Sequence, residues 1–461
     1  MIKKILHFTI FTFYQAFSLT INVPEDFLDI QDAIDSSQDG DTIFVSPGVY
    51  SENINFNGKS ILVSSNYIED NDSLLIGVTI IDAGNEGSVV TFNSGENNNA
   101  ILQGFTLQNG NGNDEDPDNN GSFYTYGGGI FCENSDPLIK DCIIQNNTAN
   151  EGGGAGIFCY DASPVFFGCT IKENETDDVG GGLYARDGSS PSFFNCIFMD
   201  NTAEFGGGCY LKSSSSPVME NVVFMQNNAN NSGGGIGLKD DANIEASNLT
   251  IAENLAEGLG GGLYINNADP TFSFALIVDN TASSGAGIYI RNNSEIDLAN
   301  ITLANNNAGL YGGGVYMRDN ATVNFLNSVL WNNGSNQIYF RSEGTEVELN
   351  VSYSIVENNQ NGVETNNNGD LNWLEGNLDS EPYFCSSSTG NYFVRENSPC
   401  LDGGLNGSLV GCLSAGCGPI NLGPVWYVDS NGDNTSDGSL ETPFETIARA
   451  VNVSSDGDTI R

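Results

Sequence analysis

Apolar and polar residues alternate along most of this chain in short runs, and this alternation predicts half-buried strands. The runs come in units that open on a Gly-Gly-Gly or Gly-Ala-Gly triplet, as in GGGIFC at Gly127 and GGGLYA at Gly180. The third glycines follow one another at intervals of 25 to 27 residues and are Gly129, Gly156, Gly182, Gly208, Gly235, Gly262, Gly287 and Gly314. Self-similarity at this period is typical of a solenoid, in which each unit buries its apolar face against its neighbours.

The repeat is predicted to be built from strands alone. No unit shows a helical period, and the density of glycine, asparagine and proline argues against paired helices. We therefore predict an all-β fold, a right-handed parallel β-helix solenoid with about 26 residues per coil and three short strands in each coil.

A column of asparagines supports this prediction. We expect the amide side chains to stack along the helix axis, at a turn where asparagine tolerates a left-handed backbone. The column comprises Asn147, Asn174, Asn201, Asn227, Asn254, Asn280, Asn306, Asn333 and Asn359. Three residues before each member lies an apolar residue, from Ile144 to Val356, that is expected to point inward.

The glycine triplet followed by an F-x-x-N element, as in FMDN at Phe198 and FMQN at Phe224, resembles a known repeat. It is similar to the repeat of chlamydial polymorphic outer membrane proteins, which group with the pectin-lyase-like β-helices. The resemblance covers roughly residues 127 to 360. It implies secretion or display at the outer membrane and a role in adhesion.

The chain divides into five predicted segments. Residues 1–18 have the features of a secretory signal peptide, with Lys3 and Lys4 before an apolar run that is too short to span a membrane, so no transmembrane helix is predicted. Residues 19–60 form an entrance cap and first coil, with a short amphipathic helix near 30–36. The coils fill 61–379, a closing cap follows at 380–424, and 425–461 begins a second, truncated β-helix, because AVNVSSDGDTI at Ala450 repeats AIDSSQDGDTIFV at Ala33.

Nine of the ten cysteines fall into two groups. Cys142, Cys169 and Cys196 share one inward column and Cys132 and Cys159 another, which favours stacked thiols over bridges between coils. Cys385, Cys400, Cys412 and Cys417 lie outside the repeat, in a stretch that resembles the closing segment of bacterial β-helix proteins. There we favour a Cys385–Cys400 disulfide over free thiols.

Charge and composition exclude several functions. The chain carries 14 Lys and Arg against 59 Asp and Glu, a net charge of −45 at pH 7, which argues against nucleic acid and anionic membranes as partners. Its single histidine, His7, lies in the predicted signal peptide. Histidine-dependent triads and histidine-rich metal sites are therefore excluded. The histidine- and lysine-containing signatures of polygalacturonases, which share this fold, are also absent.

The few basic residues are concentrated in one row. Six of the nine residues found four positions after the third glycine, or aligned with that position, are basic: Arg186, Lys212, Lys239, Arg291, Arg318 and Arg341. Two positions earlier stand aromatic residues that include Tyr184, Tyr210, Tyr289 and Tyr316. Both positions are expected on the outer face, opposite the aliphatic positions. They predict a groove in which rings contact sugar faces and cations bind carboxylates or sulfates.

A structural interpretation of the same row stays open. The cations also suit pairing with Asp187, Asp240 and Asp319, and outward tyrosines are common in strands. For calcium, acidic loops supply two candidate ligand sets: Asp114, Asp116 and Asp118, and Asp429, Asp433 and Asp437. We favour a secreted or surface-displayed module without catalytic activity that serves adhesion or binds an acidic polysaccharide or cell-surface glycan. The alternative is a calcium-dependent polysaccharide lyase or epimerase.

Overall fold

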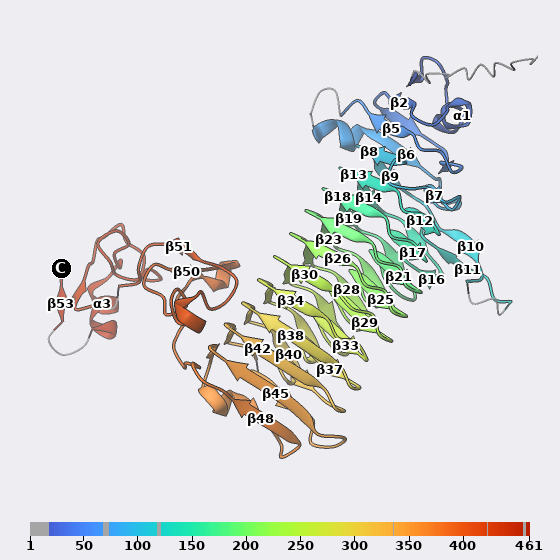
Figure 1. Cartoon of the computed structure of the whole chain (residues 1–461). Helices are drawn as coiled ribbons and strands as arrows, with labels where there is room; N and C mark the ends of the chain where they lie inside the picture. Colours follow the sequence, from blue (N-terminus) through green and yellow to red (C-terminus); the bar gives the residue numbers. More distant parts are fainter. Residues whose placement is uncertain (1–17, 68–72, 118–120, 335, 422, 455–457) are drawn as a thin grey trace, which may run out of the picture.

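The computed structural model describes residues 18–67, 73–117, 121–334, 336–421, 423–454 and 458–461 (Figure 1). Coils stack into one rod, with α1 (Ile30–Ser36) at its N-terminal end and residues 380–421 against the later coils. Successive strands pair in parallel, so that Ile130 lies beside Ile157 and Ile157 beside Leu183. The predicted parallel pairing of successive glycine-triplet strands and the predicted helix near residues 30–36 are both confirmed.

Three long sheets form the sides of the rod. Sheet A contains, in order, β1 (Thr20–Val23), β2 (Thr42–Val45), β5 (Leu62–Ser65), β8 (Ile101–Gln103), β13 (Leu138–Lys140), β18 (Val165–Phe167), β22 (Ser192–Phe194), β26 (Val218–Glu220), β30 (Glu245–Ser247), β34 (Thr271–Ser273), β38 (Glu295–Ala299), β42 (Thr322–Leu326), β45 (Val347–Ser352) and β48 (Gly369–Trp373). Sheet B contains β3 (Gly48–Tyr50), β6 (Thr79–Asp82), β9 (Thr106–Gln108), β14 (Ile143–Gln145), β19 (Thr170–Lys172), β23 (Ile197–Met199), β27 (Val223–Met225), β31 (Thr250–Ala252), β35 (Leu276–Val278), β39 (Thr302–Ala304), β43 (Val329–Trp331) and β46 (Ile355–Val356). Sheet C contains β4 (Ile54–Asn55), β7 (Val90–Phe92), β12 (Ile130–Glu133), β17 (Ile157–Tyr160), β21 (Leu183–Arg186), β25 (Cys209–Lys212), β29 (Ile236–Lys239), β33 (Leu263–Asn266), β37 (Ile288–Arg291), β41 (Val315–Met317), β44 (Ile338–Phe340) and β47 (Val363–Glu364).

A fourth sheet, which the prediction of three strands per coil did not include, runs along one corner of the rod. It contains β15 (Thr148–Ala149), β20 (Glu175–Thr176), β24 (Thr202–Phe205), β28 (Asn228–Ser232), β32 (Leu255–Ala256), β36 (Thr281–Ser284) and β40 (Asn307–Tyr311). The insertion before it forms a hairpin of β10 (Asn113–Glu115) and β11 (Tyr124–Tyr126), and β11 pairs in parallel with β16 (Glu151–Gly153). Short 3-10 turns lie at Ser73–Val78, Asn359–Gly362, Ser387–Thr389 and Leu405–Gly407.

In the core of the rod, side chains from equivalent positions of successive coils stack in columns. Ile144, Ile171, Phe198 and Phe224 are fully buried, and the rings of Phe198 and Phe224 stack with centroids 4.8 Å apart. The glycine triplets let neighbouring coils approach. The first glycine takes a left-handed backbone, as at Gly180 with φ +67°, and a Cβ on the third, Gly182, would lie 2.4 Å from the carbonyl oxygen of Gly208.

The asparagine column forms a buried hydrogen-bonded ladder from Asn147 to Asn333. The Nδ2 of each member donates to the Oδ1 of the next at 2.9 to 3.0 Å. The predicted stacking is thus confirmed, but the predicted left-handed backbone is wrong for these eight members. The residue before each of them, such as Glu173 or Asp200 with φ 54°, takes that conformation. Asn359 instead begins a 3-10 turn and itself has φ 55°.

The inward cysteines remain thiols, as predicted. Cys132, Cys142, Cys159, Cys169, Cys196 and Cys209 are buried and free. The favoured Cys385–Cys400 disulfide is wrong, because Cys385 is bonded to Cys417 and Cys400 is a buried thiol. The reason is the pairing of a small sheet of β49 (Phe384–Ser386), β50 (Asn391–Arg395) and β51 (Ala415–Cys417), which places the two bonded cysteines on its outer strands with their Cα atoms 6.1 Å apart.

This small sheet and its loops lie against the side of the rod. The Tyr392 hydroxyl donates to Asp279 Oδ2 at 2.7 Å, and Asn300 Nδ2 donates to the Leu409 carbonyl at 2.7 Å. Beyond it, β52 (Val425–Trp426) pairs in parallel with β53 (Thr459–Ile460), and α3 (Ile447–Val453) connects them. The same order of strand, helix and parallel strand occurs in β1, α1 and β2. That this unit begins a second β-helix stays a prediction.

Candidate functional site

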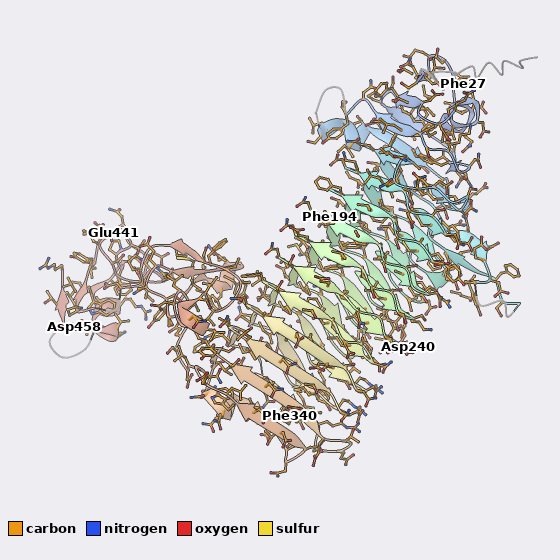
Figure 2. All side chains as sticks on the ribbon, viewed as in Figure 1. Phe27, Phe194, Asp240, Phe340, Glu441 and Asp458 are labelled. Atoms are coloured by element: carbon orange, nitrogen blue, oxygen red, sulfur yellow. A yellow bond between two sulfur atoms is a disulfide. The ribbon has the colours of Figure 1, made fainter. Side chains whose placement is uncertain are left out.

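The candidate site is the outer face of sheet C. The residues at the ends of its strands align in one row across the coils, with Tyr160 beside Arg186, Lys212 beside Lys239, and Asn266 beside Arg291. Neighbouring members are therefore about 4.8 Å apart, the spacing of adjacent strands. We call Arg186, Lys212, Lys239, Arg291, Arg318 and Arg341 the cation row. Figure 2 shows Asp240, the neighbour of Lys239, at one edge of the rod, and Phe194 of sheet A at the opposite edge.

The tyrosines beside the row are buried, so the predicted exposure of their rings to sugars is wrong. Tyr184 is 4% exposed, Tyr210 6%, Tyr289 2% and Tyr316 9%. The segment that links the fourth sheet to each glycine triplet folds over the rings, with Val179, Phe205 and Leu259 packed against them. The ring faces contact one another, and Tyr289 stacks on Tyr316 with centroids 4.9 Å apart.

The aromatic column is interrupted at Gly237. Rings before it form one cluster that ends at Tyr210, and rings after it form another from Tyr264 onward. The ring of Tyr210 leans into the space at Gly237, since a Cβ there would lie 2.7 Å from Tyr210 Cδ2. The coil that contains Gly237 is thus irregular on this face, because it has no aromatic ring in the column.

Three of the six cations in the row form an ion pair with the aspartate that directly follows them in the sequence. Arg186 pairs with Asp187, Arg318 with Asp319, and Lys239 Nζ lies 3.9 Å from Asp240 Oδ2. The predicted pairing of these three cations with Asp187, Asp240 and Asp319 is confirmed. Within the described residues, Lys212, Arg291 and Arg341 form no ion pair.

Ionisable groups gather around Lys212, close to the break in the aromatic column. Burial raises the pKa of the Asp178 carboxyl, an effect that Lys212 opposes and Glu204 reinforces. Burial likewise raises the pKa of the Tyr210 hydroxyl, and Asp178 adds to that effect. This group contains a carboxyl, an amine and a phenol, and it was not predicted from the sequence.

An acidic cavity marks the N-terminal end of the row. It measures about 230 Å³ and is lined by Glu115, Asp116, Pro117, Phe131, Glu133, Phe158 and Tyr160. The hairpin of β10 and β11 supplies one wall, and the Tyr160 hydroxyl donates to the Pro117 carbonyl at 3.4 Å. Burial raises the pKa of Glu115, and the charges of Glu133 and Asp114 raise it further. The Arg186 guanidinium lies 5.9 Å from the Tyr160 ring centroid, so the face changes from acidic to basic at this residue.

The structure describes one of the two predicted calcium sets completely, Asp429, Asp433 and Asp437, whereas the other includes Asp118, outside the described residues. Among the described residues, no group of three or more His, Cys, Asp or Glu side chains could hold a metal ion. The carboxylates bind nearby backbone instead, because Asp readily closes a turn with an N–H two residues ahead. Asp429 accepts from Asn431 N, Asp433 from Thr435 N and Asp437 from Ser439 N, at 2.8 to 3.0 Å. Asp116 accepts from Gly121 N, Asp114 is exposed, and Asp118 lies outside the described residues.

Comparison with protein-family models gives two matches to the right-handed β-helix region, over residues 118–273 and 234–398, which together cover more than half of the chain. The chain belongs to the right-handed β-helix family. The predicted handedness and fold of this right-handed β-helix are thereby confirmed. No curated protein sequence matches it.

Two solved structures are similar to this right-handed β-helix. One is the A-module of mannuronan C-5 epimerase AlgE4 from Azotobacter vinelandii, with 15% identity, a TM-score of 0.44, and coverage of 76% of this chain and 95% of that one. The other is pectate lyase Pel9A, with 12% identity, a TM-score of 0.44, and coverage of 87% and 97%. Within the described residues, no helix of this right-handed β-helix is long and apolar enough to cross a membrane.

Proposed function

We infer that this chain is an exported or surface-displayed module that binds an acidic polysaccharide along the outer face of sheet C without cleaving it. The observation that carries the proposal is the cation row, which is one residue wide and in register along the coils, with one interruption at Asn266. A polyanion has a charge on each repeating unit, and a row of cations at strand spacing can contact several of these units at once. The tyrosines contribute rigidity to the row, since their ring faces pack against one another.

Charge also orients such a ligand. The acidic cavity of Glu115 and Glu133 repels a polyanion, so the bound chain is expected to run from Arg186 toward Arg341. Lys212, Arg291 and Arg341 have the largest role in this proposal, because an incoming carboxylate does not have to displace a protein carboxylate from them. Export rests on the predicted signal peptide, of which residues 1–17 lie outside the described residues.

The test is a matched pair of double variants. Lys212→Gln with Arg341→Gln removes two cations from the row, and Lys140→Gln with Lys172→Gln removes two cations from sheets A and B. A hydrogen bond to a charged group contributes about 1.5–3 kcal/mol, so the row variant should bind polygalacturonate at least about tenfold more weakly. The control variant should bind like the parent. Equal binding by the parent and both variants, or no binding by the parent, overturns the proposal.

A second candidate function rests on the ionisable group around Lys212. A carboxyl of raised pKa, an amine and a phenol near one irregular coil are groups that general acid–base chemistry requires. A lyase or an epimerase that acts on a uronate, the alternative predicted from the sequence, would need groups of this kind. Incubation with polyuronates and calcium tests it, because a lyase creates unsaturated ends that absorb ultraviolet light. Absorbance that grows with time in the parent and not in Asp178→Asn would replace the non-catalytic proposal with this one.

A further inference from the structure

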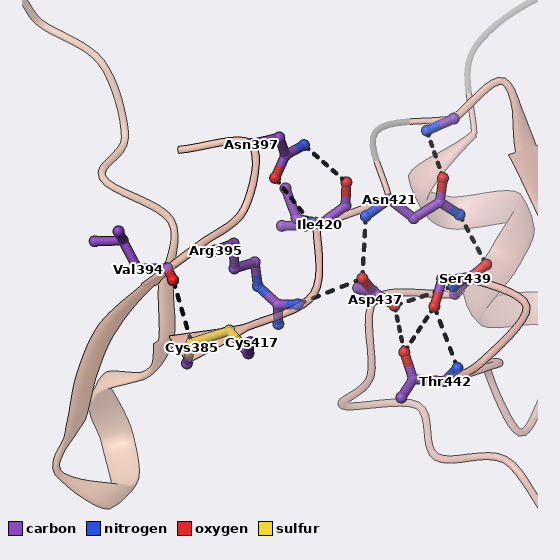
Figure 3. Close-up of polar contacts among 12 residues, drawn as sticks. Cys385, Val394, Arg395, Asn397, Cys417, Ile420, Asn421, Asp437, Ser439 and Thr442 are labelled. Atoms are coloured by element: carbon purple, nitrogen blue, oxygen red, sulfur yellow. Dashed lines mark hydrogen bonds and ion pairs between the residues drawn. A yellow bond between two sulfur atoms is a disulfide. The ribbon is translucent and has the colours of Figure 1, made fainter. Parts of the chain in front are cut away.

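A second cavity lies away from sheet C, between the small disulfide-bonded sheet and the C-terminal unit. Its volume is about 670 Å³, within the range of ligand pockets, about 300–1,000 Å³. The lining combines hydroxyl and amide groups with apolar surface, and it includes Arg395, Asn421, Tyr427, Ser436, Leu440 and Thr442. Figure 3 shows the arrangement, with the Cys385–Cys417 disulfide beside Arg395 on one side and Asp437 on the other.

The carboxylate in this cavity is already saturated with donors. Asp437 accepts hydrogen bonds from Asn421 N at 3.0 Å, Ser439 N at 3.0 Å and Thr442 Oγ1 at 2.6 Å. Although burial opposes it, these hydrogen bonds lower the pKa of Asp437, which keeps the carboxylate ionised. Asp437 thus ties the C-terminal unit together independently of Arg395.

The Arg395 guanidinium, in contrast, has few contacts for its number of donors. Arg395 is held at the end of β50, where its backbone N–H donates to the Tyr383 carbonyl at 2.9 Å. Its Nη1 lies 3.6 Å from Asp437 Oδ2, which is its only ion pair among the described residues, and its side chain is 22% exposed. A guanidinium carries five N–H donors in a planar fork that matches a carboxylate. Most of these donors therefore remain for a ligand in the cavity.

We propose that this cavity binds a short acidic saccharide, with Arg395 as the ligand of its carboxylate. The Ser436, Thr442 and Asn421 side chains suit sugar hydroxyls, and Tyr427, Ile420 and Leu440 offer apolar surface for the C–H faces of a sugar ring. Glu441 and the ionised Asp437 also line the cavity, and both charges oppose the binding of an anion. The site shares a ligand class with the proposed function but uses none of the residues of the cation row, and neither inference requires the other.

Calorimetric titration of the full chain with trigalacturonate tests the proposal. Arg395→Gln should weaken binding tenfold or more, and Arg449→Gln, which removes an arginine outside the cavity lining, should leave it unchanged. Glu441→Gln should strengthen binding two- to threefold, because it removes a repelling charge. Ser436→Trp should weaken binding, because the indole occupies part of the cavity. This variant retains both Arg395 and Asp437, so it tests the cavity without removing either charge.

The outcomes separate this site from the cation row. In the Lys212→Gln and Arg341→Gln background, which removes any binding of trigalacturonate to these two cations, the titration should still show a binding step that Arg395→Gln weakens tenfold or more, whether or not the row binds this ligand in the parent. Maltotriose, a neutral trisaccharide, should bind at least tenfold more weakly than trigalacturonate. No binding of trigalacturonate, equal binding by Arg395→Gln, or equally tight binding of acetate would each overturn the proposal.

Discussion

Asn280 and Asn306 are joined twice across neighbouring coils. The Nδ2 of Asn280 donates to the Oδ1 of Asn306 at 2.9 Å, and the backbone N–H of Asn280 donates to the same oxygen at 3.0 Å. Both side chains are fully buried. One amide oxygen therefore satisfies two buried donors of the preceding coil, and the ladder repeats this arrangement along the rod.

Asn306→Ala is expected to destabilise the rod strongly. It leaves the two Asn280 donors without an acceptor, and each unsatisfied buried group costs about 1–3 kcal/mol. The free energy of unfolding should therefore fall by about 2–6 kcal/mol, which urea denaturation would show as a lower midpoint. Asn307→Ala provides the matched control, because Asn307 is the next residue, is exposed, and belongs to β40. Comparable losses in both variants would contradict the role of the ladder.

Gly182→Ala is expected to destabilise the stacking of coils. Its Cβ would lie 2.4 Å from the Gly208 carbonyl oxygen and 2.9 Å from Phe198 Cδ1, so the coils have to separate locally. Overpacking of this kind costs about 1–3 kcal/mol. Gly77→Ala meets no atom within 4 Å and should change the thermal midpoint little. A Gly182→Ala protein with the parent's melting temperature would show that the close approach is dispensable.

Peptide mapping is expected to find Cys385 linked to Cys417 and Cys400 unlinked. Cys400 is fully buried, and burial raises the pKa of its thiol to about 11, so alkylation of the folded protein should leave it unmodified. Unfolding in urea should make it react within minutes. A peptide that links Cys385 to Cys400 would restore the sequence-based assignment.

The sequence predicted the repeat well because packing in a solenoid is periodic. Residues such as Ile144, Ile171 and Phe198 recur in one column, and each column has one environment along the whole rod. The fourth sheet had a signal of the same kind that was not used. Two residues after each ladder asparagine from Asn147 to Asn306 stands a small buried residue, as at Ala203, Ala229 and Ala256.

The site was harder to predict because a periodic sequence pattern does not indicate how deeply a side chain on the outer face is buried. Positions two and four after the glycine triplet do lie outside the main core, as expected. Whether they are exposed depends on the chain segment that folds over them, and Val179 and Phe205 cover Tyr184 and Tyr210. The disulfide was missed for a related reason: proximity of Cys385 and Cys417 arises from pairing among β49, β50 and β51, outside the repeat.

Replacement of Asp178 is expected to stabilise the protein in a pH-dependent way. Burial raises the pKa of this carboxyl above its unfolded value, so the folded state binds the proton more tightly. The charged carboxylate therefore destabilises the fold above its folded pKa, and this penalty fades as the pH falls to the unfolded value, about 3.9. Asp178→Asn should raise the urea midpoint at pH 7, and the gain should shrink toward pH 4. Asp161→Asn, at an exposed residue, should show no such trend.

Salt is expected to distinguish the cation row from less specific contacts. Exposed charges are screened as ionic strength rises, and the Debye length falls from about 10 Å at 0.1 M to about 3 Å at 1 M. The affinity of the parent for polygalacturonate should therefore fall steeply with added sodium chloride. The Lys212→Gln and Arg341→Gln variant should show a shallower slope, because it has lost two of the screened contacts, whereas the Lys140→Gln and Lys172→Gln variant should keep the parent slope. Parallel slopes for all three proteins would mean that the polymer binds outside the row, even if its affinity for the parent is high.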